Sequence, residues 1–251
     1  MTKYAALRLA ALVSTLLLVL AWWRQDALPA PERLRPELLA EPVQQAVDEP
    51  AFRRTVDAVE YGIQPRYTYD ISGLIVSLHH SDTWWDTAHA EWNDHINLMD
   101  LCVVWGDNAA SGVYREIHFS NTQWECHFET RSSESWQRFH LDQVSNNHLL
   151  TDDPVIARAM KSLHVGDEVR LRGYLVNYTI FDGSVARGTR VSSETRTDTG
   201  PGACEVMYVQ GIDILARHNA AWRWLRMGAT ISLALCLGAF LVLPPHLEES
   251  G

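Results

Sequence analysis

Two apolar segments, one near each end of the chain, constrain its fold more than any other feature. Residues 4–23 follow Lys3 and are apolar apart from Ser, Thr and Arg8. They end in two tryptophans without a small-residue cleavage site, which indicates an uncleaved signal anchor rather than a cleaved signal peptide. Residues 227–243 carry no charge and follow a Trp/Arg collar at residues 217–226. We therefore expect a second, C-terminal membrane span, with a buried helix of a soluble domain as the alternative.

Two spans would place residues 24–226 on one side of a membrane. Lys3 and Arg8 favour a cytoplasmic N-terminus. Several arginines flank the other ends of the two spans and would instead favour a cytoplasmic position for the segment between them. The first span usually sets the orientation, and long domains cross the membrane largely regardless of charge. We therefore expect a bacterial inner-membrane protein with a periplasmic domain, in contact with the lipid bilayer. A formal net charge of −10 argues against nucleic acid as a partner, because nonspecific binding needs a basic surface.

The segment between the spans divides by composition and pattern. Residues 25–58 are rich in proline and predict a linker, and residues 59–216 predict a β-rich globular domain. Thr151 to Asp153 precede a helix at residues 154–163 with Pro154 in its first turn. The predicted strands lie at residues 56–78 (two short strands around Gln64-Pro65), 101–105, 114–119, 123–128, 168–178, 204–210 and 212–215.

A glycine in the middle of the longest predicted strand indicates the fold. Gly173 interrupts residues 168–178, and a glycine at such a place often marks the bulge or sharp bend that a small barrel requires. The sequence therefore predicts a mostly β fold with one capping helix: a small OB-like barrel flanked by two transmembrane helices. A β-sandwich is the alternative.

The densest polar constellation lies in residues 192–215, around a predicted turn at residues 200–202. One interpretation is a hydrogen-bonded loop pinned by arginine–carboxylate pairs. The other is a ligand pocket with an arginine that binds an anion and a carboxyl group that acts as acid or base. We read residues 145–148 as a polar turn. The pocket interpretation assigns catalysis to Arg196, Asp198, Glu205 and His148, and ligand binding to Arg190, Arg196, Asp198, Asn146 and Asn147.

Residues 79–100 form a second polar segment, rich in histidine and aspartate, which we expect to be a partly helical excursion between strands. Imidazole and carboxylate groups suit zinc and similar ions, but the spacing matches no metal motif, and solvated histidines explain the segment equally well. No cofactor is expected. The candidate metal ligands are His79, His80, His89 and His95, and the carboxylates of Asp82, Asp94 and Asp100 are further possible ligands.

The four cysteines lack the C-x-x-C spacing of zinc ribbons and thioredoxins. Cys102 and Cys126 lie on two predicted strands. They form a disulfide if those strands are neighbours in an oxidising compartment, and are otherwise two buried thiols. Cys236 belongs to the second apolar segment. Cys204 is then the odd cysteine, either free or paired elsewhere.

Several blocks of residues 60–215 resemble uncharacterised exported or membrane-anchored proteins of Gram-negative bacteria. The resemblance is strongest at SNNHLL and TRTDTGPGACE, and extends to YDISGLIVSLHHSDTWW, DLCVVWG and GDEVRLRGYLV. It implies an envelope location and no known activity. The second apolar segment departs from the simpler N-terminally anchored form of that group. GDEVRLRGYLV also resembles the bent strand of an OB-type barrel.

Three functions are compatible with these features. The first is a noncatalytic envelope module that binds a ligand or a membrane protein partner, for example as an accessory subunit, because the sequence contains no complete catalytic motif. The second is a hydrolase-type enzyme with a pocket around Arg196, Asp198 and Glu205. The third is a metal- or redox-sensing domain that uses Cys204 or the histidine-rich segment.

Overall fold

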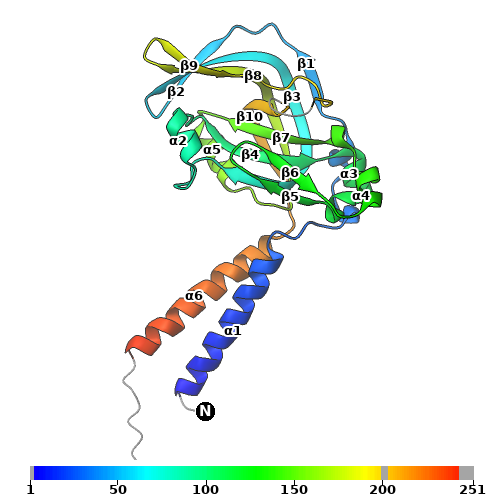
Figure 1. The fold of residues 1–251 in the computed structure, drawn as a ribbon. Coiled ribbons are helices and arrows are strands. Elements are labelled where there is room, and N and C mark those ends of the chain that lie inside the picture. Colours follow the sequence, from blue (N-terminus) through cyan, green and yellow to red (C-terminus); the bar gives the residue numbers. More distant parts are fainter. Residues whose placement is uncertain (1–2, 199–202, 243–251) are drawn as a thin grey trace, which may run out of the picture. The chain divides into compact units, whose positions relative to one another are not determined.

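The computed structural model describes residues 3–198 and 203–242, so the predicted turn at residues 200–202 lies outside the described residues. The chain divides into two compact units, Met1–Ala27 with His218–Gly251, and Leu28–Arg217. Figure 1 shows the ribbon of both units.

The terminal unit consists of two helices, α1 (Lys3–Arg24) and α6 (Ala220–Val242). Both are long and apolar enough to cross a membrane by length and composition. They pack against each other, with the hydroxyl groups of Ser14 and Ser232 hydrogen-bonded at 2.8 Å. Helix α6 begins before the apolar run, so its first turns include part of the predicted collar. The Arg24 guanidinium lies 5.6 Å from the centroid of the Trp222 ring.

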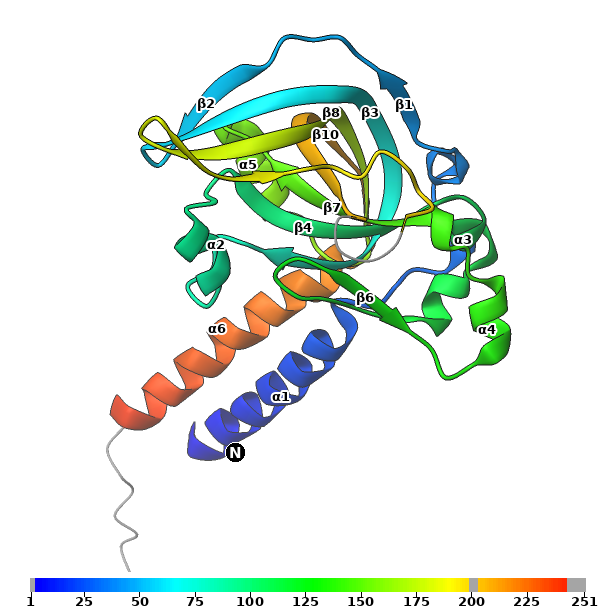
Figure 2. The same cartoon turned by 45° about the horizontal axis from the view of Figure 1, so that its top comes forward.

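The central unit is mostly sheet, with short helices between the strands (Figures 1 and 2). Its strands are β1 (Val43–Ala46), β2 (Phe52–Val56), β3 (Val59–His80), β4 (Asn97–Val104), β5 (His118–Asn121), β6 (Cys126–Glu129), β7 (Val144–Leu150), β8 (Asp167–Asp182), β9 (Val185–Arg190) and β10 (Glu205–Arg217). Its helices are η1 (Pro31–Arg33), η2 (Pro36–Leu39), α2 (Thr87–Trp92), α3 (Gly106–Ser111), η3 (Val113–Glu116), α4 (Ser133–Arg138), η4 (Leu141–Gln143) and α5 (Pro154–Lys161).

Most of the strands belong to one mixed sheet. The pairing runs β1-β3-β4-β7-β10-β8-β9, β2 pairs with β3, and β3 pairs in addition with β8. Strands β7 and β10 are parallel, and the other pairs in this sheet are antiparallel. Strands β5 and β6 form a separate hairpin. Helix α5 lies within the helix that the sequence predicts at residues 154–163 and precedes β8. The Asp153 carboxylate accepts a hydrogen bond from the Val155 amide at its N-terminus.

The prediction of two short strands around Gln64-Pro65 is wrong, because β3 runs unbroken from Val59 to His80. The register with β8 shifts between Pro65 and Tyr67, so the proline lies beside a bulge. A proline cannot donate to a sheet ladder, and a bulge is where a strand tolerates it. Figure 2 shows the strong curvature of β3.

Strand β10 is likewise one strand where the sequence suggests two. Its register with β8 shifts between Val209 and Gly211, opposite Gly173 and Arg172. A Cβ atom on Gly173 would lie 2.1 Å from the carbonyl oxygen of Tyr208, so only glycine fits this close approach. The mid-strand glycine therefore does mark a bulge. The bulge lets the strand continue through Gly211.

The polar turn expected at residues 145–148 is also wrong, because these residues lie in β7, within the mixed sheet. Their polar side chains have partners inside the fold. The Asn147 amide donates to the Leu101 carbonyl and to the Ser145 hydroxyl, and His148 pairs with Asp100. Strand β4 correspondingly begins at Asn97, inside the segment expected to be an excursion. Buried polar groups that are hydrogen-bonded can occupy a strand that composition assigns to a loop.

One apolar cluster receives side chains from five strands of the sheet and from helix α5. Because successive side chains of a strand point to opposite faces, this cluster defines the inner face of those strands. Its buried members include Ile71 of β3, Leu101 of β4, Leu149 of β7, Met160 of α5, Leu171 of β8 and Met207 of β10.

Candidate functional site

The SNNHLL and ACE segments meet because β7 and β10 are parallel neighbours. Asn147 lies opposite Glu205, and His148 lies opposite Val206. Side chains alternate along a strand, so Asn146 and His148 project from the face opposite that of Asn147. Cys204 directly precedes β10 and contacts Asn146, on the face that carries Asn146 and His148. Two segments more than fifty positions apart thereby form one polar surface.

A buried ion pair lies at the centre of this surface. Asp100 of β4 pairs with His148 of β7 in the strand register, and Asp100 Oδ1 lies 2.6 Å from His148 Nδ1. The two side chains are 0% and 5% exposed. Burial opposes protonation of the ring, but the Asp100 carboxylate and a hydrogen-bonding interaction with Cys204 outweigh it and raise the pKa of His148 to about 9.

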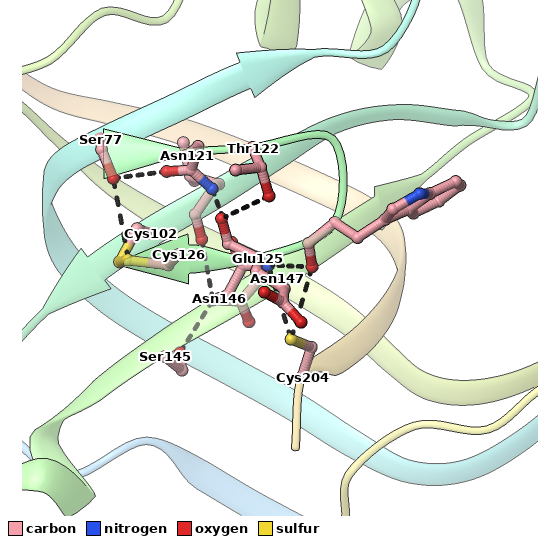
Figure 3. Close-up of a disulfide and its surroundings, with 12 residues drawn as sticks. Ser77, Cys102, Asn121, Thr122, Glu125, Cys126, Ser145, Asn146, Asn147 and Cys204 are labelled. Carbon is pink, nitrogen blue, oxygen red and sulfur yellow. Dashed lines mark hydrogen bonds between the residues drawn. A yellow bond between two sulfur atoms is a disulfide. The ribbon is translucent and has the colours of Figure 1, made fainter. Parts of the chain in front are cut away.

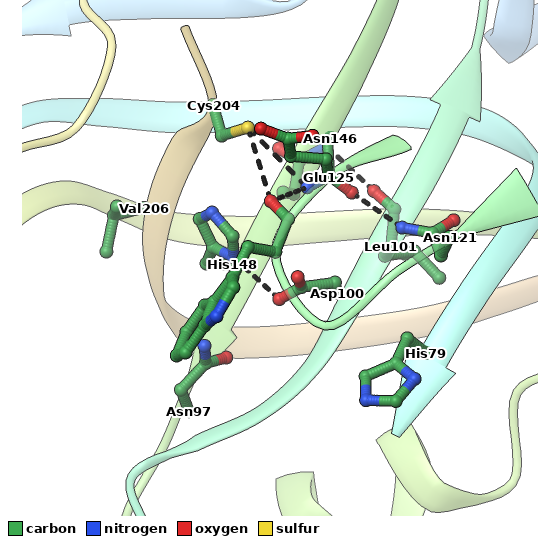
Figure 4. A network of polar contacts seen from close by, with 12 residues as sticks. His79, Asn97, Asp100, Leu101, Asn121, Glu125, Asn146, His148, Cys204 and Val206 are labelled. Carbon is green, nitrogen blue, oxygen red and sulfur yellow. Dashed lines mark hydrogen bonds and ion pairs between the residues drawn. The ribbon is translucent and has the colours of Figure 1, made fainter. Parts of the chain in front are cut away.

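Cys204 is a free, half-buried cysteine beside that ion pair. The Asn146 Nδ2 group donates to its sulfur at 3.6 Å, and the thiol lies 3.8 Å from the carbonyl oxygen of Trp124. Asn121 of the β5–β6 hairpin donates to Asn146 Oδ1 at 3.0 Å, which fixes the orientation of that amide. In Figure 4 the His148 ring lies between Cys204 and Asp100, with the nitrogen that does not bind Asp100 on the side of Cys204.

Cys204 lines a cavity of about 610 Å³. The cavity wall contains the start of β7, the β5–β6 hairpin and the chain on both sides of residues 199–202. Its polar lining includes Asn146, Thr195, Arg196, Asp198, Cys204 and Glu205. Phe128, Trp136, Leu141 and Val144 supply much of its apolar wall. Its size and mixed lining are those of a small-ligand site.

Four predicted site residues line this cavity: Asn146, described above, and Arg196, Asp198 and Glu205, which do not pair only with one another. The Asp198 carboxylate accepts from the Ser193 hydroxyl at 2.8 Å. Arg196 donates to the carbonyl oxygen of Pro42, and its Nε has no partner among the described residues. Glu205 is 4% exposed, and its Oε2 likewise has no partner there. Burial raises the pKa of Glu205 to about 8, against the opposing effect of Arg196.

The other two ligand-binding candidates, Arg190 and Asn147, do not line the cavity, and neither does the catalytic candidate His148. Asn147 bonds within the sheet, as described above. Arg190 of β9 lies over the Trp124 ring, with its Cζ 3.9 Å from the ring centroid. Trp124 also lies close to the rings of His89 and His148, at 3.8 and 6.2 Å between centroids. It therefore forms an aromatic cover over this polar surface.

The four candidate metal ligands do not converge. His79 and His89 both bond to Asp86 Oδ2, at 2.7 and 2.8 Å, and His89 Nε2 lies 3.1 Å from the Asn97 amide. His95 instead donates its backbone amide to the Tyr61 hydroxyl. Among the described residues, no three His, Cys, Asp or Glu side chains are placed to hold a metal ion. The segment thus forms a histidine–aspartate network beside the site.

Cys102 and Cys126 form a disulfide, one of the two alternatives that the sequence leaves open. It joins β4 to the β5–β6 hairpin, and Cys102 lies opposite Asn146 in the strand register (Figure 3). The hairpin carries Asn121 and, in its turn, Trp124. The disulfide therefore holds the two groups that contact Asn146 and Cys204.

Replacing both Cys102 and Cys126 by alanine is expected to lower the free energy of unfolding by about 3 kcal/mol, because the bond closes a loop of 24 positions. Urea unfolding followed by tryptophan fluorescence measures this loss. A Cys236→Ala variant is the control, since Cys236 belongs to α6. Equal urea midpoints for the double variant and the oxidised native protein would contradict the prediction.

Sequence reasoning considered Asp100 only as a possible metal ligand, and it did not identify Asn121 or Trp124. Asp100 is the residue that most defines it, yet it falls at the boundary between the histidine-rich segment and the apolar run LCVVW. An aspartate that directly precedes a buried strand was the available signal. Comparison with known proteins adds nothing to this geometry: no protein-family model, curated protein or solved structure matches the chain.

Proposed function

We propose that this chain is a membrane-anchored, extracytoplasmic module that binds a small ligand in the cavity next to Cys204. The observation that carries the proposal is the buried Glu205 carboxyl, which lines the cavity with one oxygen unpartnered among the described residues. A buried polar group without a partner costs free energy, and a ligand donor would relieve that cost. Arg196, with an unpartnered Nε in the same wall, supplies the donor for an acidic or polar ligand group.

We further propose that the central unit is an OB-like barrel. Three observations support a barrel over a sandwich: the succession β3-β4-β7-β10-β8 with the additional β3–β8 pairing, the inner apolar cluster fed by all five strands, and helix α5 between β7 and β8. The parallel β7–β10 pair also suits an OB-type strand order. The ligand cavity would then lie where β7 and β10 begin, at one edge of the barrel.

The proposed location is a bacterial inner membrane with the central unit in the periplasm. Two helices fit for membrane crossing support the anchoring, and an N-terminal Lys3 and Arg8 support the orientation. The Cys102–Cys126 disulfide supports an oxidising compartment. Both helices also expose large apolar side chains, such as Leu16 and Leu235, to lipid or to a membrane protein that this chain would serve as an accessory subunit.

A hydrolase-type activity is the second candidate function. It is favoured by one specific observation: the bonded pair of His148 and Asp100 lies near Cys204, which lines the cavity (Figure 4). A nucleophile, a ring that exchanges protons and a buried carboxylate that orients this ring are the parts of a covalent catalytic site. Arg196, Asp198 and Glu205 would then bind the substrate.

Filling the cavity is expected to remove a bound ligand. Ala203 lines it, and an Ala203→Trp variant would place an indole in the space. We expect the full chain, purified in mild detergent, to carry a small molecule that mass spectrometry detects after denaturation. The amount of this molecule per protein is expected to be at least about tenfold lower in the variant. Val191→Trp is the matched control, because Val191 is 60% exposed and outside the cavity wall. Identical small-molecule contents in all three proteins would refute the proposal.

A further inference from the structure

We infer that Cys204 is a nucleophile for acyl transfer. His148 donates a proton to the leaving group and accepts one from water, and Asp100 positions the His148 ring. Asn146 donates a hydrogen bond to the carbonyl oxygen of the substrate. The inference rests on the proposed ligand cavity. It names the substrate class as an ester or thioester whose acyl carbon lies against the Cys204 sulfur.

The first support is access. Cys204 lines the cavity and is half-buried, whereas the other free cysteine, Cys236, is buried in α6. The Glu205 carboxyl in the same wall indicates a ligand independently of the thiol. Glu205 is only 4% exposed, and its Oε2 has no hydrogen-bond partner among the described residues. The thiol and the unpartnered carboxyl therefore both belong to the lining of one cavity.

The second support is the arrangement around His148. Its Nδ1 is occupied by Asp100 at 2.6 Å, and its other ring nitrogen lies on the side of Cys204 (Figure 4). Asp100 is fully buried on β4, so the ring has one orientation. Arg190 disfavours protonation of the ring without reversing the effect of Asp100. The carboxyl groups of Asp94 and Glu205 also interact electrostatically with His148. A protonated imidazole beside a thiol stabilises the thiolate, which is the nucleophilic form.

The third support is an oriented amide at the sulfur. Asn146 Nδ2 lies 3.6 Å from Cys204 Sγ and 3.2 Å from the carbonyl oxygen of Trp124, while its Oδ1 accepts from Asn121. The network fixes which end of the amide points at Cys204 (Figures 3 and 4). An N–H at this place can bind the oxygen on which negative charge develops when the sulfur attacks a carbonyl carbon.

The steps balance with water as the only co-reactant. The thiol releases its proton to solvent, and the thiolate forms a bond to the acyl carbon while the carbonyl electron pair moves to oxygen, held by Asn146. The tetrahedral species collapses and expels an alcohol or thiol, which takes the proton from His148 Nε2. Neutral His148 then removes a proton from water as it attacks the thioester, and a carboxylic acid and the thiolate are released.

The test uses the full chain in mild detergent with Cys236→Ser, so that Cys204 is its one unpaired cysteine, and p-nitrophenyl acetate as the acyl donor. We expect a burst of p-nitrophenolate equal to the protein present and an acetyl group on Cys204 by mass spectrometry. Cys204→Ala removes both. His148→Gln slows acetylation about 100-fold.

Asn146→Ala separates a catalytic from a structural role. It is expected to slow acetylation about 100-fold while iodoacetamide, which alkylates the thiolate without forming an oxyanion, reacts as fast as with the parent protein. The absence of an acetyl group on Cys204, or equal acetylation rates in the parent, His148→Gln and Asn146→Ala proteins, overturns the inference. If the Ala203→Trp variant loses its copurified ligand but the parent is not acetylated, the binding function stands and only this inference fails. Acetylation that depends on Cys204, together with unchanged ligand content in Ala203→Trp, supports the inference and refutes the binding function.

Discussion

An Asp100→Asn variant is expected to lose about 3 kcal/mol of unfolding free energy at pH 6.5, near the lower end of the cost of breaking a buried ion pair. Asp100 is fully buried and His148 nearly so, and their side chains meet at 2.6 Å. The amide retains the shape of the carboxylate and removes its charge. The imidazolium then has to lose its proton or remain buried without an opposite charge.

The size of this loss depends on pH in a direction that the His148 pKa fixes. The folded protein holds the pKa of His148 at about 9, above its ordinary value of 6.5. The stabilisation from this pair is therefore fully present below about pH 6.5 and is lost as the pH rises through 9. The shift corresponds to about 3 kcal/mol. The stability difference between the native protein and Asp100→Asn should thus shrink towards zero above pH 9.

Urea unfolding of the full chain at several pH values between 6 and 10 measures both quantities. Asp70→Asn is the matched control, because Asp70 pairs with Arg170 in a partly exposed position on β3. That surface pair is expected to contribute less than about 1 kcal/mol. A stability difference for Asp100→Asn that stays constant from pH 6.5 to pH 10 would show that the carboxylate does not act through the charge of His148.

The sequence predicted some elements of the fold and missed others: the strand predicted at residues 114–119 is the helix η3 (Val113–Glu116) followed by β5. Helix α5, the bulge at Gly173 and the β-rich character follow from local patterns: a capping aspartate, a proline in the first turn, a glycine within an alternating strand. The unbroken β3 and β10 do not, because a bulge at Arg66 or Gln210 is defined by the partner strand. A proline or glycine that would end an isolated strand is tolerated where a bulge accommodates the shift in register against the neighbouring strand.

Some residues of the candidate site were predictable from the sequence, whereas their arrangement and the parts played by Asp100, Asn121 and Trp124 were not. Arg196, Asp198 and Glu205 do line one cavity, since they lie close together in sequence. Composition assigned Asn146, Asn147 and His148 to a turn because it carries no information on partners. Only the β4–β7 register places Asp100 opposite His148, and only the parallel β7–β10 pair brings Cys204 beside Asn146. The chemistry of the site is thus a consequence of pairing between distant strands.

A Glu205→Gln variant is expected to become more stable than the native protein as the pH rises. Burial holds the pKa of Glu205 at about 8 in the folded chain, against an ordinary value of 4.5. The native protein therefore has the full contribution of the protonated carboxyl below about pH 4.5 and loses it progressively as the pH rises through 8. Glutamine has the shape of the protonated acid and no proton to lose. The difference between the two proteins should change by roughly 4 kcal/mol in favour of glutamine between pH 4.5 and pH 8.

Urea unfolding at pH 5 and at pH 8 tests this, with Glu194→Gln as the control because Glu194 pairs with Arg66 near the surface. The control is expected to change stability by less than about 1 kcal/mol at both pH values. Parallel pH profiles for the native protein and Glu205→Gln would mean that the carboxyl is ionised and paired when the protein is folded, which would also remove the observation that supports a ligand in the cavity. A rising advantage for glutamine would mean that the native chain keeps a destabilising acid at this position, which is the expected cost of a group retained to bind a ligand.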